Sequence, residues 1–245
     1  YAGAFVRDPN GNLIIDGSGR PFRNPVNQFL GYTNPDWTWG VRNTLTYKNF
    51  GFGFQFDGWV GGNYINYIQR QTFRGGRHEE TVLNNIKDAN GQGMADARYQ
   101  DYLGVQSWVA EGMVISNGVA PKYDVDGNIT NYAELEFAPN TKATFLQDYI
   151  SRYYAQEEAN LMSRTFTKLR EVTITYNIPA EKFKGNFIRG ASFSLVGRNL
   201  LYFAEEKNVD VEQFTGTTDP NAVAGYSGLQ SPTLRRFGVN LNFTF

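Results

Sequence analysis

The sequence predicts an all-β fold, specifically a segment of a membrane β-barrel, and three observations carry the prediction. Five stretches alternate apolar and polar residues with a period of two, which places the apolar side chains on one face of a strand. The connections between these stretches sort into long and short ones. The chain also combines 16% aromatic residues with 26 glycines, a composition typical of strands and turns.

Composition argues against several other classes of protein. The 23 basic and 24 acidic side chains leave a formal net charge of −1, so there is no electrostatic footprint for nucleic acid or anionic lipid. The absence of cysteine excludes disulfides and thiolate metal sites. No apolar run approaches the ~18 residues that a membrane helix needs, whereas barrel strands give a much weaker hydropathy signal.

The first two predicted strands form a hairpin. Tyr1–Arg7 is expected to be the tail of an earlier strand, and the Pro-, Asn- and Gly-rich segment up to about Asp36 is expected to be a loop with a small hairpin. Along Trp37–Lys48, aromatic residues occupy both ends of the apolar face, as in the aromatic belt of a membrane strand. A tight turn at Asn49 leads to phenylalanine at every second position of Phe50–Phe56, and these rings must be covered by protein or lipid.

Residues 61–162 contain no long alternating strand and are interpreted as a long extracellular loop region. A helix is expected within it from about Thr141 to Ala159, because Phe145, Tyr149 and Tyr153 recur at helical spacing. A connection of this length is unusual in a compact soluble domain. Long loops are ordinary on one side of an outer-membrane barrel.

The third predicted strand, Arg164–Ile178, follows this loop region. Its second half has a membrane-type apolar face, and Arg164, Lys168 and Arg170 are expected on the same face nearer its start. Pro179 ends the strand, because proline cannot donate to a ladder.

Two more strands follow. Ala191–Phe203 has a weaker pattern, because Val196 and Leu200 interrupt the alternation. Phe237–Phe245 alternates strictly over its whole length. At ~2.5 Å of climb per tilted residue this last strand covers ~23 Å, which matches an apolar band of ~25 Å.

The connections, counted along the chain, are long, short, long, short and long. Alternate connections of an up-and-down sheet lie at the same end, so the long ones fall on one side, as in outer-membrane barrels with short periplasmic turns and long extracellular loops. Open edges are not tolerated in lipid, and the smallest such barrel has about eight strands. We therefore interpret 1–245 as the C-terminal part of a transmembrane β-barrel, its last five to six antiparallel strands.

The alternation assigns the strand residues to two faces. The apolar face is predicted to contact lipid through Trp37, Trp39, Val41, Tyr47, Phe50, Phe52, Phe54, Phe56, Val172, Ile174, Tyr176, Phe237, Val239, Leu241, Phe243 and Phe245. The polar face is predicted to line a lumen through Arg42, Thr44, Gln55, Asp57, Thr173, Arg198, Asn240 and Asn242.

Few residues suggest site chemistry. Asp124, Asp126 and Asn128 match the start of a calcium loop, but the Glu at its twelfth position is missing and Asp-Gly-Asn is a good turn by itself. His78 stands among charged residues of a polar segment and is expected to be solvated. We expect no metal, no cofactor and no enzymatic activity.

Three stretches resemble one family. Asn34–Trp37 with Gly40 and Thr44–Phe50 resembles a signature of SusC/RagA-type TonB-dependent transporters. Phe166–Pro179 is similar to that family's "LR-x-V-x-x-x-Y-x-x-P" strand, and Ser194–Leu201 to its "GRNL" strand.

The resemblance implies a multi-pass outer-membrane barrel of about 22 strands with a plugged lumen. It also implies energy coupling to TonB, a SusD-like surface lipoprotein as partner, and an oligosaccharide or peptide as substrate. Two alternatives from other classes stay open. One is a soluble β-sandwich that binds carbohydrate, in which Phe50–Phe56 would pack against a second sheet. The other is a barrel with a structural or secretion-associated role.

Overall fold

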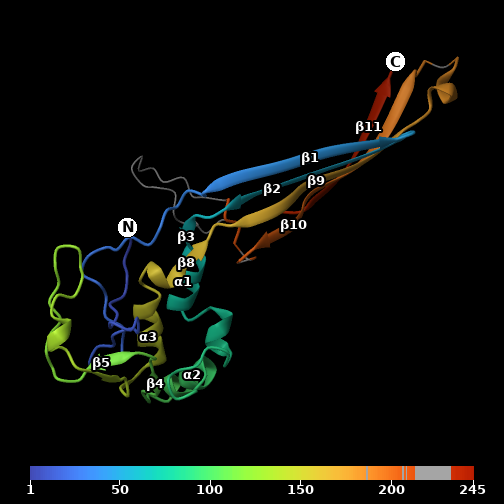
Figure 1. Cartoon of the computed structure of the whole chain (residues 1–245). Coiled ribbons are helices and arrows are strands. Elements are labelled where there is room, and N and C mark those ends of the chain that lie inside the picture. The colour runs from blue at the N-terminus through green and yellow to red at the C-terminus, as the bar shows by residue number, and fades with distance from the viewer. Residues whose placement is uncertain (186, 206, 208, 213–232) are drawn as a thin grey trace. The chain divides into compact units, whose positions relative to one another are not determined.

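The computed structural model describes residues 1–185, 187–205, 207, 209–212 and 233–245. The chain divides into two compact units, and each unit is built from two separate stretches of sequence (Figure 1). The first unit contains Tyr1–Gly31 and Ile65–Leu161, and the second contains Tyr32–Tyr64 and Met162–Phe245.

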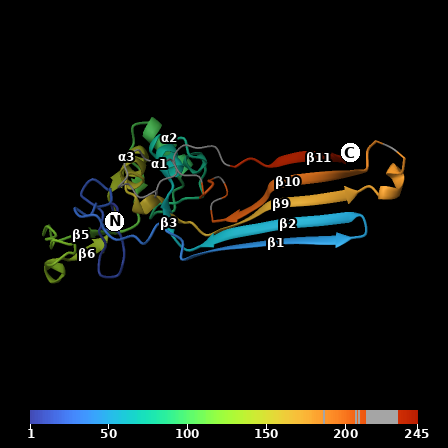
Figure 2. The same ribbon diagram turned by 90° about the horizontal axis from the view of Figure 1, so that it is seen from above.

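The second unit is a five-stranded antiparallel sheet in the order β1-β2-β9-β10-β11 (Figures 1 and 2). Its strands are β1 (Trp37–Tyr47), β2 (Phe50–Val60), β9 (Phe166–Asn177), β10 (Gly190–Ala204) and β11 (Arg236–Thr244). Each strand pairs with the next one of the five along the chain, so the sheet is an up-and-down meander. All five predicted strands are therefore present, close to their predicted bounds.

Both short connections lie at one end of this sheet. A two-residue turn, Lys48–Asn49, joins β1 to β2, with Lys48 in the left-handed conformation at φ 53°. The link from β9 to β10 contains the 3₁₀ helix η4 (Ala180–Phe183). The N–H of Asn177, at the end of β9, donates to the carbonyl of Asn49 over 2.8 Å. The long connections leave from the opposite end, as the sorting of loop lengths predicted.

Two bulges interrupt the ladders in the middle of the sheet. Between β2 and β9, Gln55 pairs with Glu171 and Phe56 pairs with Leu169, which leaves Arg170 as an extra residue. A residue of this kind reverses the alternation of side chains along its strand. The register between β9 and β10 also shifts at this level.

Because of the bulge, three basic residues lie on the polar face and not on the predicted apolar face. Lys168 lies opposite Asp57, on the polar face of the sheet, and Arg170 pairs with the same aspartate. The guanidinium of Arg164 stacks 4.8 Å from the ring of Trp59, which shares the alternation of Asp57. Their expected position on the apolar face was wrong, because an alternation count cannot register one extra residue within a strand.

The first unit has three α-helices and its own apolar core. The helices are α1 (Tyr67–Arg74), α2 (Met94–Tyr102) and α3 (Leu146–Tyr153). Buried side chains that include Phe73 and Trp108 pack together in the core. No helix among the described residues is long and apolar enough to cross a membrane.

Short 3₁₀ helices and strands lie outside the large sheet and the three α-helices. The 3₁₀ helices are η1 (Glu79–Val82), η2 (Tyr132–Glu134) and η3 (Glu158–Asn160). Three two-stranded sheets pair β3 (Asn63–Ile65) with β8 (Leu161–Ser163), β4 (Trp108–Val109) with β7 (Ala143–Thr144), and β5 (Met113–Ile115) with β6 (Phe137–Pro139).

The expected helix over 141–159 is present but shorter. It begins only at Leu146, because Ala143–Thr144 pairs as a strand and the carboxylate of Asp101 caps the helix. Asp101 accepts the N–H of Leu146 over 2.9 Å and that of Gln147 over 2.8 Å. Such a cap satisfies free donors at a helix start, and it comes from a residue far away in the sequence.

The expected strand tail at Tyr1–Arg7 is not a strand of the large sheet. The segment belongs to the first unit, where Ala4, Phe5 and Val6 are buried. It makes single bridges, such as the one between Phe5 and Arg23, instead of a ladder. A three-residue apolar run cannot distinguish a barrel strand from a core segment.

Candidate functional site: the polar face of the sheet

The register of the sheet aligns side chains of all five strands in transverse rows. One row on the polar face contains Arg42, Gln55, Glu171, Arg198 and Arg236. Within it, Nε of Arg198 donates to a carboxylate oxygen of Glu171 over 2.9 Å. Charged and amide groups thus extend across the full width of the sheet.

A hollow of about 430 Å³ lies on this polar face. Gly51 and Gly53 of β2 border it and contribute no side chain, which leaves room between the longer polar residues. The predicted lumen residues that line it are Arg42, Thr44, Gln55, Thr173, Arg198 and Asn240. Asp57 and Asn242 share the alternation of these residues but do not line the hollow.

The opposite face is predominantly apolar. One row contains Leu45, Phe52, Ile174, Leu195 and Val239, one residue from each strand. These five side chains are between 39% and 58% exposed. The predicted lipid-facing residues that lie within strands follow the same alternation. Phe245 is the residue immediately after the end of β11.

This exposure argues against the β-sandwich alternative. That alternative requires the Phe50–Phe56 rings to be buried against a second sheet. In the described part of the chain, Phe50 is 56% exposed and Phe52 is 39% exposed, and the other sheets have two strands each. An apolar surface as continuous as this one marks contact with lipid or another protein.

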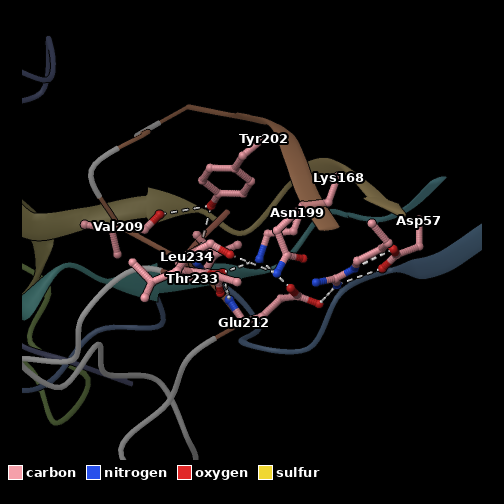
Figure 3. A network of polar contacts seen from close by, with 11 residues as sticks. Asp57, Lys168, Asn199, Tyr202, Val209, Glu212, Thr233 and Leu234 are labelled. Carbon is pink, nitrogen blue, oxygen red and sulfur yellow. Dashed lines mark hydrogen bonds and ion pairs between the residues drawn. The ribbon is translucent and has the colours of Figure 1, made fainter. Parts of the chain in front are cut away.

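A network of ion pairs occupies the polar face near the long connections (Figure 3). The ammonium of Lys168 lies 2.6 Å from Asp210 and 2.6 Å from Glu212, and its side chain is 3% exposed. The guanidinium of Arg170 binds both oxygens of Asp57, at 2.5 and 2.8 Å, and also pairs with Glu212. Such a fork is the strongest geometry for an arginine and a carboxylate.

Hydrogen bonds fix the segment that carries these acids. The hydroxyl of Tyr202 donates to the carbonyl of Val209 over 3.0 Å and accepts the N–H of Val211 over 3.3 Å (Figure 3). Val209 and Val211 are buried. The ammonium of Lys168 also lies 4.9 Å from the centre of the Tyr202 ring, a cation–π contact. The start of the β10–β11 connection is therefore bound to the sheet by charge and packing together.

The environment of Asp210 keeps it ionised. Burial acts to raise the pKa of this carboxyl, but hydrogen bonds from Lys168 and from the hydroxyl of Thr233 lower the pKa below its ordinary value. A buried charge is tolerated only when it is paired and hydrogen-bonded in this way. Asp210 lies in the connection beyond β10.

Sequence reasoning identified only Asp57 among the charged members of this network. Lys168 and Arg170 were expected on the other face, and Asp210 and Glu212 lie in a long polar connection with no periodic pattern. The usable signal was the matching spacing of two basic residues and two acidic residues, each pair two positions apart. That signal was not specific enough to predict that the two segments contact each other.

The calcium candidates form a hydrogen-bonded turn. One carboxylate oxygen of Asp124 accepts the N–H groups of Asp126 and Asn128, at 3.0 and 2.8 Å, and the other accepts the Asn128 amide at 3.0 Å. The hydrogen bond from the Asn128 side chain is the largest cause that lowers the pKa of Asp124. Both oxygens of Asp124 are therefore engaged within the turn, which supports the turn interpretation of this motif.

The same turn recurs at three other places in the first unit. Oδ1 of Asp8, Asp16 and Asp88 likewise accepts the N–H groups two and four residues later. In all four turns a glycine three positions after the aspartate has a φ between 78° and 87°. Aspartate and glycine are used here for backbone geometry.

His78 is half-buried and packs against the core. Its ring stacks on Phe73 with centroids 3.8 Å apart, and its Nδ1 accepts the N–H of Glu80 over 3.3 Å. The expectation of a solvated side chain was wrong, because the neighbouring charges in the sequence did not reveal the aromatic contact.

Comparison with known proteins gives related sequences and a related fold, while no family model matches the chain. The chain is 25% identical over 245 residues to TonB-dependent receptor P26 of Formosa agariphila, covering 99% of this chain and 20% of the relative. It is 26% identical over 141 residues to TonB-dependent receptor P3 of the same organism, covering 57% of this chain and 13% of that protein.

A solved structure shares the fold. The RagAB peptide importer in its open-open state matches with a TM-score of 0.54 at 16% identity, over 100% of this chain and 22% of the importer chain. The chain thus spans about one fifth of the length of these proteins. These matches support the resemblance of the three sequence motifs to a segment of a SusC/RagA-type TonB-dependent receptor.

Proposed function

We propose that the chain is part of a TonB-dependent importer that carries an oligosaccharide or a peptide across the outer membrane. The apolar face of the sheet contacts lipid, and the polar face lines the transport lumen. The long connections extend outside the cell, where a SusD-like surface lipoprotein binds the receptor. TonB acts on parts of the receptor outside this chain. The proposal rests on the similarity to TonB-dependent receptors and on the geometry of the sheet.

The observation that carries the proposal is the separation of the two faces across all five strands. Apolar rows such as the one through Phe52 and Val239 are exposed, whereas the polar rows on the other side enclose a hollow lined by Arg42, Gln55 and Arg198. A membrane barrel has this arrangement, with apolar groups outside and polar groups inside. An enzyme active site is not suggested by these rows, since they hold no nucleophile activated by a base.

Uptake by cells that produce the complete receptor tests the proposal. Cells with and without the receptor gene are given radiolabelled oligosaccharide and peptide mixtures, in the presence and absence of active TonB. We expect accumulation of one substrate class that requires both proteins. Receptor that assembles in the outer membrane but changes no uptake would instead favour the structural or secretion-associated alternative.

Purification from native membranes tests the partner. A tagged complete receptor is solubilised in mild detergent, and its companions are identified by mass spectrometry. We expect a surface lipoprotein in a stoichiometric amount. A receptor that imports substrate but purifies alone would refute the lipoprotein partner and leave the transport function standing.

A further inference from the structure

Four arginines of the first unit lie close together outside the site described above. Arg70 and Arg74 stand one turn apart on α1, Arg152 is in the last turn of α3, and Arg23 comes from the N-terminal stretch. Helices α1 and α3 contact one another. Residues three or four apart on a helix share a face, so α1 presents two guanidinium groups to the same neighbourhood.

Backbone carbonyls hold two of these side chains in place. Arg23 donates to the carbonyl of Arg152 over 3.5 Å, and Nε of Arg152 donates to the carbonyl of Pro21 over 3.4 Å. Both contacts are long, which leaves donor capacity on each guanidinium. A positive group at the end of α3 also suits the helix dipole.

The charges in this arginine cluster do not balance. Glu157 is the carboxylate that pairs with Arg70, at 3.0 Å, and its other oxygen already accepts the N–H of Gly3. Burial is the largest cause that lowers the pKa of Arg23, and repulsion from Arg152, Arg74 and Arg70 lowers it further. Among the described residues the cluster thus sets four positive groups against one negative group.

Two donors of the cluster also lack an acceptor. Nε of Arg23 and Nε of Arg70 are buried, and no atom of the described residues accepts a hydrogen bond from either. A buried donor without an acceptor is costly because it has lost its hydrogen bond to water, so native structures rarely leave one. A bound anion neutralises excess positive charge and also accepts hydrogen bonds from free donors.

We propose that Arg23, Arg70, Arg74 and Arg152 form a binding site for an oxyanion, a sulfate, phosphate or carboxylate group. The planar guanidinium fork matches the spacing of oxygens in these groups and binds them through two parallel hydrogen bonds. The group is either a free inorganic anion or a substituent of an acidic ligand. The site belongs to the first unit alone and does not depend on the transport function.

Calorimetric titration of the complete receptor in detergent tests the proposal. Sodium sulfate is the probe, and sodium chloride at equal ionic strength is the reference. We expect saturable sulfate binding that Arg23→Gln weakens at least about tenfold, because the variant loses a charge-assisted hydrogen bond to the anion. Arg77→Gln is the matched control, since Arg77 is exposed, follows α1 closely and lies outside the cluster.

A second variant protects the test against misfolding. Arg74 is exposed, and its replacement by glutamine disturbs no packing of the core. If Arg23→Gln fails to fold, Arg74→Gln must show the weakened binding. Equal heats with sulfate and chloride overturn the proposal, and so does sulfate binding that both variants retain at the strength of the Arg77→Gln control.

The source of the anion is decided with two further probes, a sulfated oligosaccharide and its desulfated counterpart. Tighter binding of the sulfated sugar than of inorganic sulfate, with none of the desulfated sugar, assigns the site to a substituent of a ligand. Binding of the sulfated sugar no tighter than inorganic sulfate assigns it to a free anion. Either result supports the site itself when Arg23→Gln or Arg74→Gln weakens the binding.

Discussion

The two units of the chain place apolar and charged side chains in opposite ways. In the first unit Phe73 is 2% exposed and Leu146 is 1% exposed, within a core made by the chain itself. In the sheet Val239 is 57% exposed, whereas the ammonium-bearing side chain of Lys168 is 3% exposed. The same residue types thus lie in opposite environments in the two units. The first unit buries its apolar side chains in its own core, whereas the described residues of the chain leave the apolar rows of the sheet uncovered.

Replacing the central cation of the ion-pair network is expected to have the largest effect on the sheet. Lys168→Met leaves Asp210 buried without a cation, at a cost of about 3–5 kcal/mol. We expect faster proteolysis next to Asp210 and a lower free energy of unfolding of the complete receptor in detergent. The matched control is Lys122→Met, which breaks the exposed pair between Lys122 and Glu134 and is expected to change little.

A compensating variant sharpens this test. Lys168→Met combined with Asp210→Leu replaces both charges by apolar groups of similar size, which is often tolerated because no charge is left unpaired. Recovery of protease resistance in the double variant would attribute the loss to the stranded charge. A double variant as sensitive as Lys168→Met alone would show that packing, and not charge pairing, secures the segment.

Truncating one aromatic ring is expected to destabilise the first unit far more than the sheet. Phe73→Ala removes a side chain stacked between Tyr154 and His78, with centroids 3.8 Å away on both sides, and costs about 3–5 kcal/mol. Phe52→Ala removes a ring from an exposed face and leaves no internal cavity. Hydrogen exchange of the complete receptor measures both variants. Equal loss of protection would contradict the contrast between the two units.

The parts that sequence could predict are those that repeat. Alternation located all five strands, and the lengths of the connections placed the short turns together, because both signals are summed over many residues. One extra residue, Arg170, could not be read from the same alternation, and it moved Lys168 to the other face. The polar row through Arg42 and Gln55 was predictable, whereas the ion-pair network was not, since Asp210 lies outside any periodic segment.

The first unit shows the same limit. The spacing of Tyr149 and Tyr153 revealed a helix, but not its start, which depends on a cap from Asp101. The arginine cluster joins α1, α3 and the N-terminal stretch, and nothing local in the sequence brings these three segments together. Contacts between distant segments are set by packing, and such packing leaves no periodic pattern in a single sequence.

A pair of adjacent arginine substitutions tests which face of the sheet meets lipid. Val239 lies on the apolar face of β11 and Asn240 on the polar face, so Val239→Arg and Asn240→Arg differ only in side. Arginine on a lipid face costs about 2–4 kcal/mol near the bilayer midplane, whereas a lumen wall is polar already. We expect poor outer-membrane assembly for Val239→Arg, measured by heat-modifiable mobility, and normal assembly for Asn240→Arg. The reverse ranking would mean that the face carrying Asn240 contacts lipid.

Acidification is expected to have the smallest effect, confined to the sheet and to low pH. The pKa of Asp210 in the folded protein lies below its ordinary value of 3.8. The stabilisation from this carboxylate is therefore complete above pH 3.8 and is lost as the pH falls through the lowered pKa. We expect pepsin to cut beside Asp210 increasingly as the pH drops below that value, and Asp210→Asn to remove this dependence. If the segment around Asp210 already leaves the sheet between about pH 5 and 7, a group other than this aspartate controls its attachment.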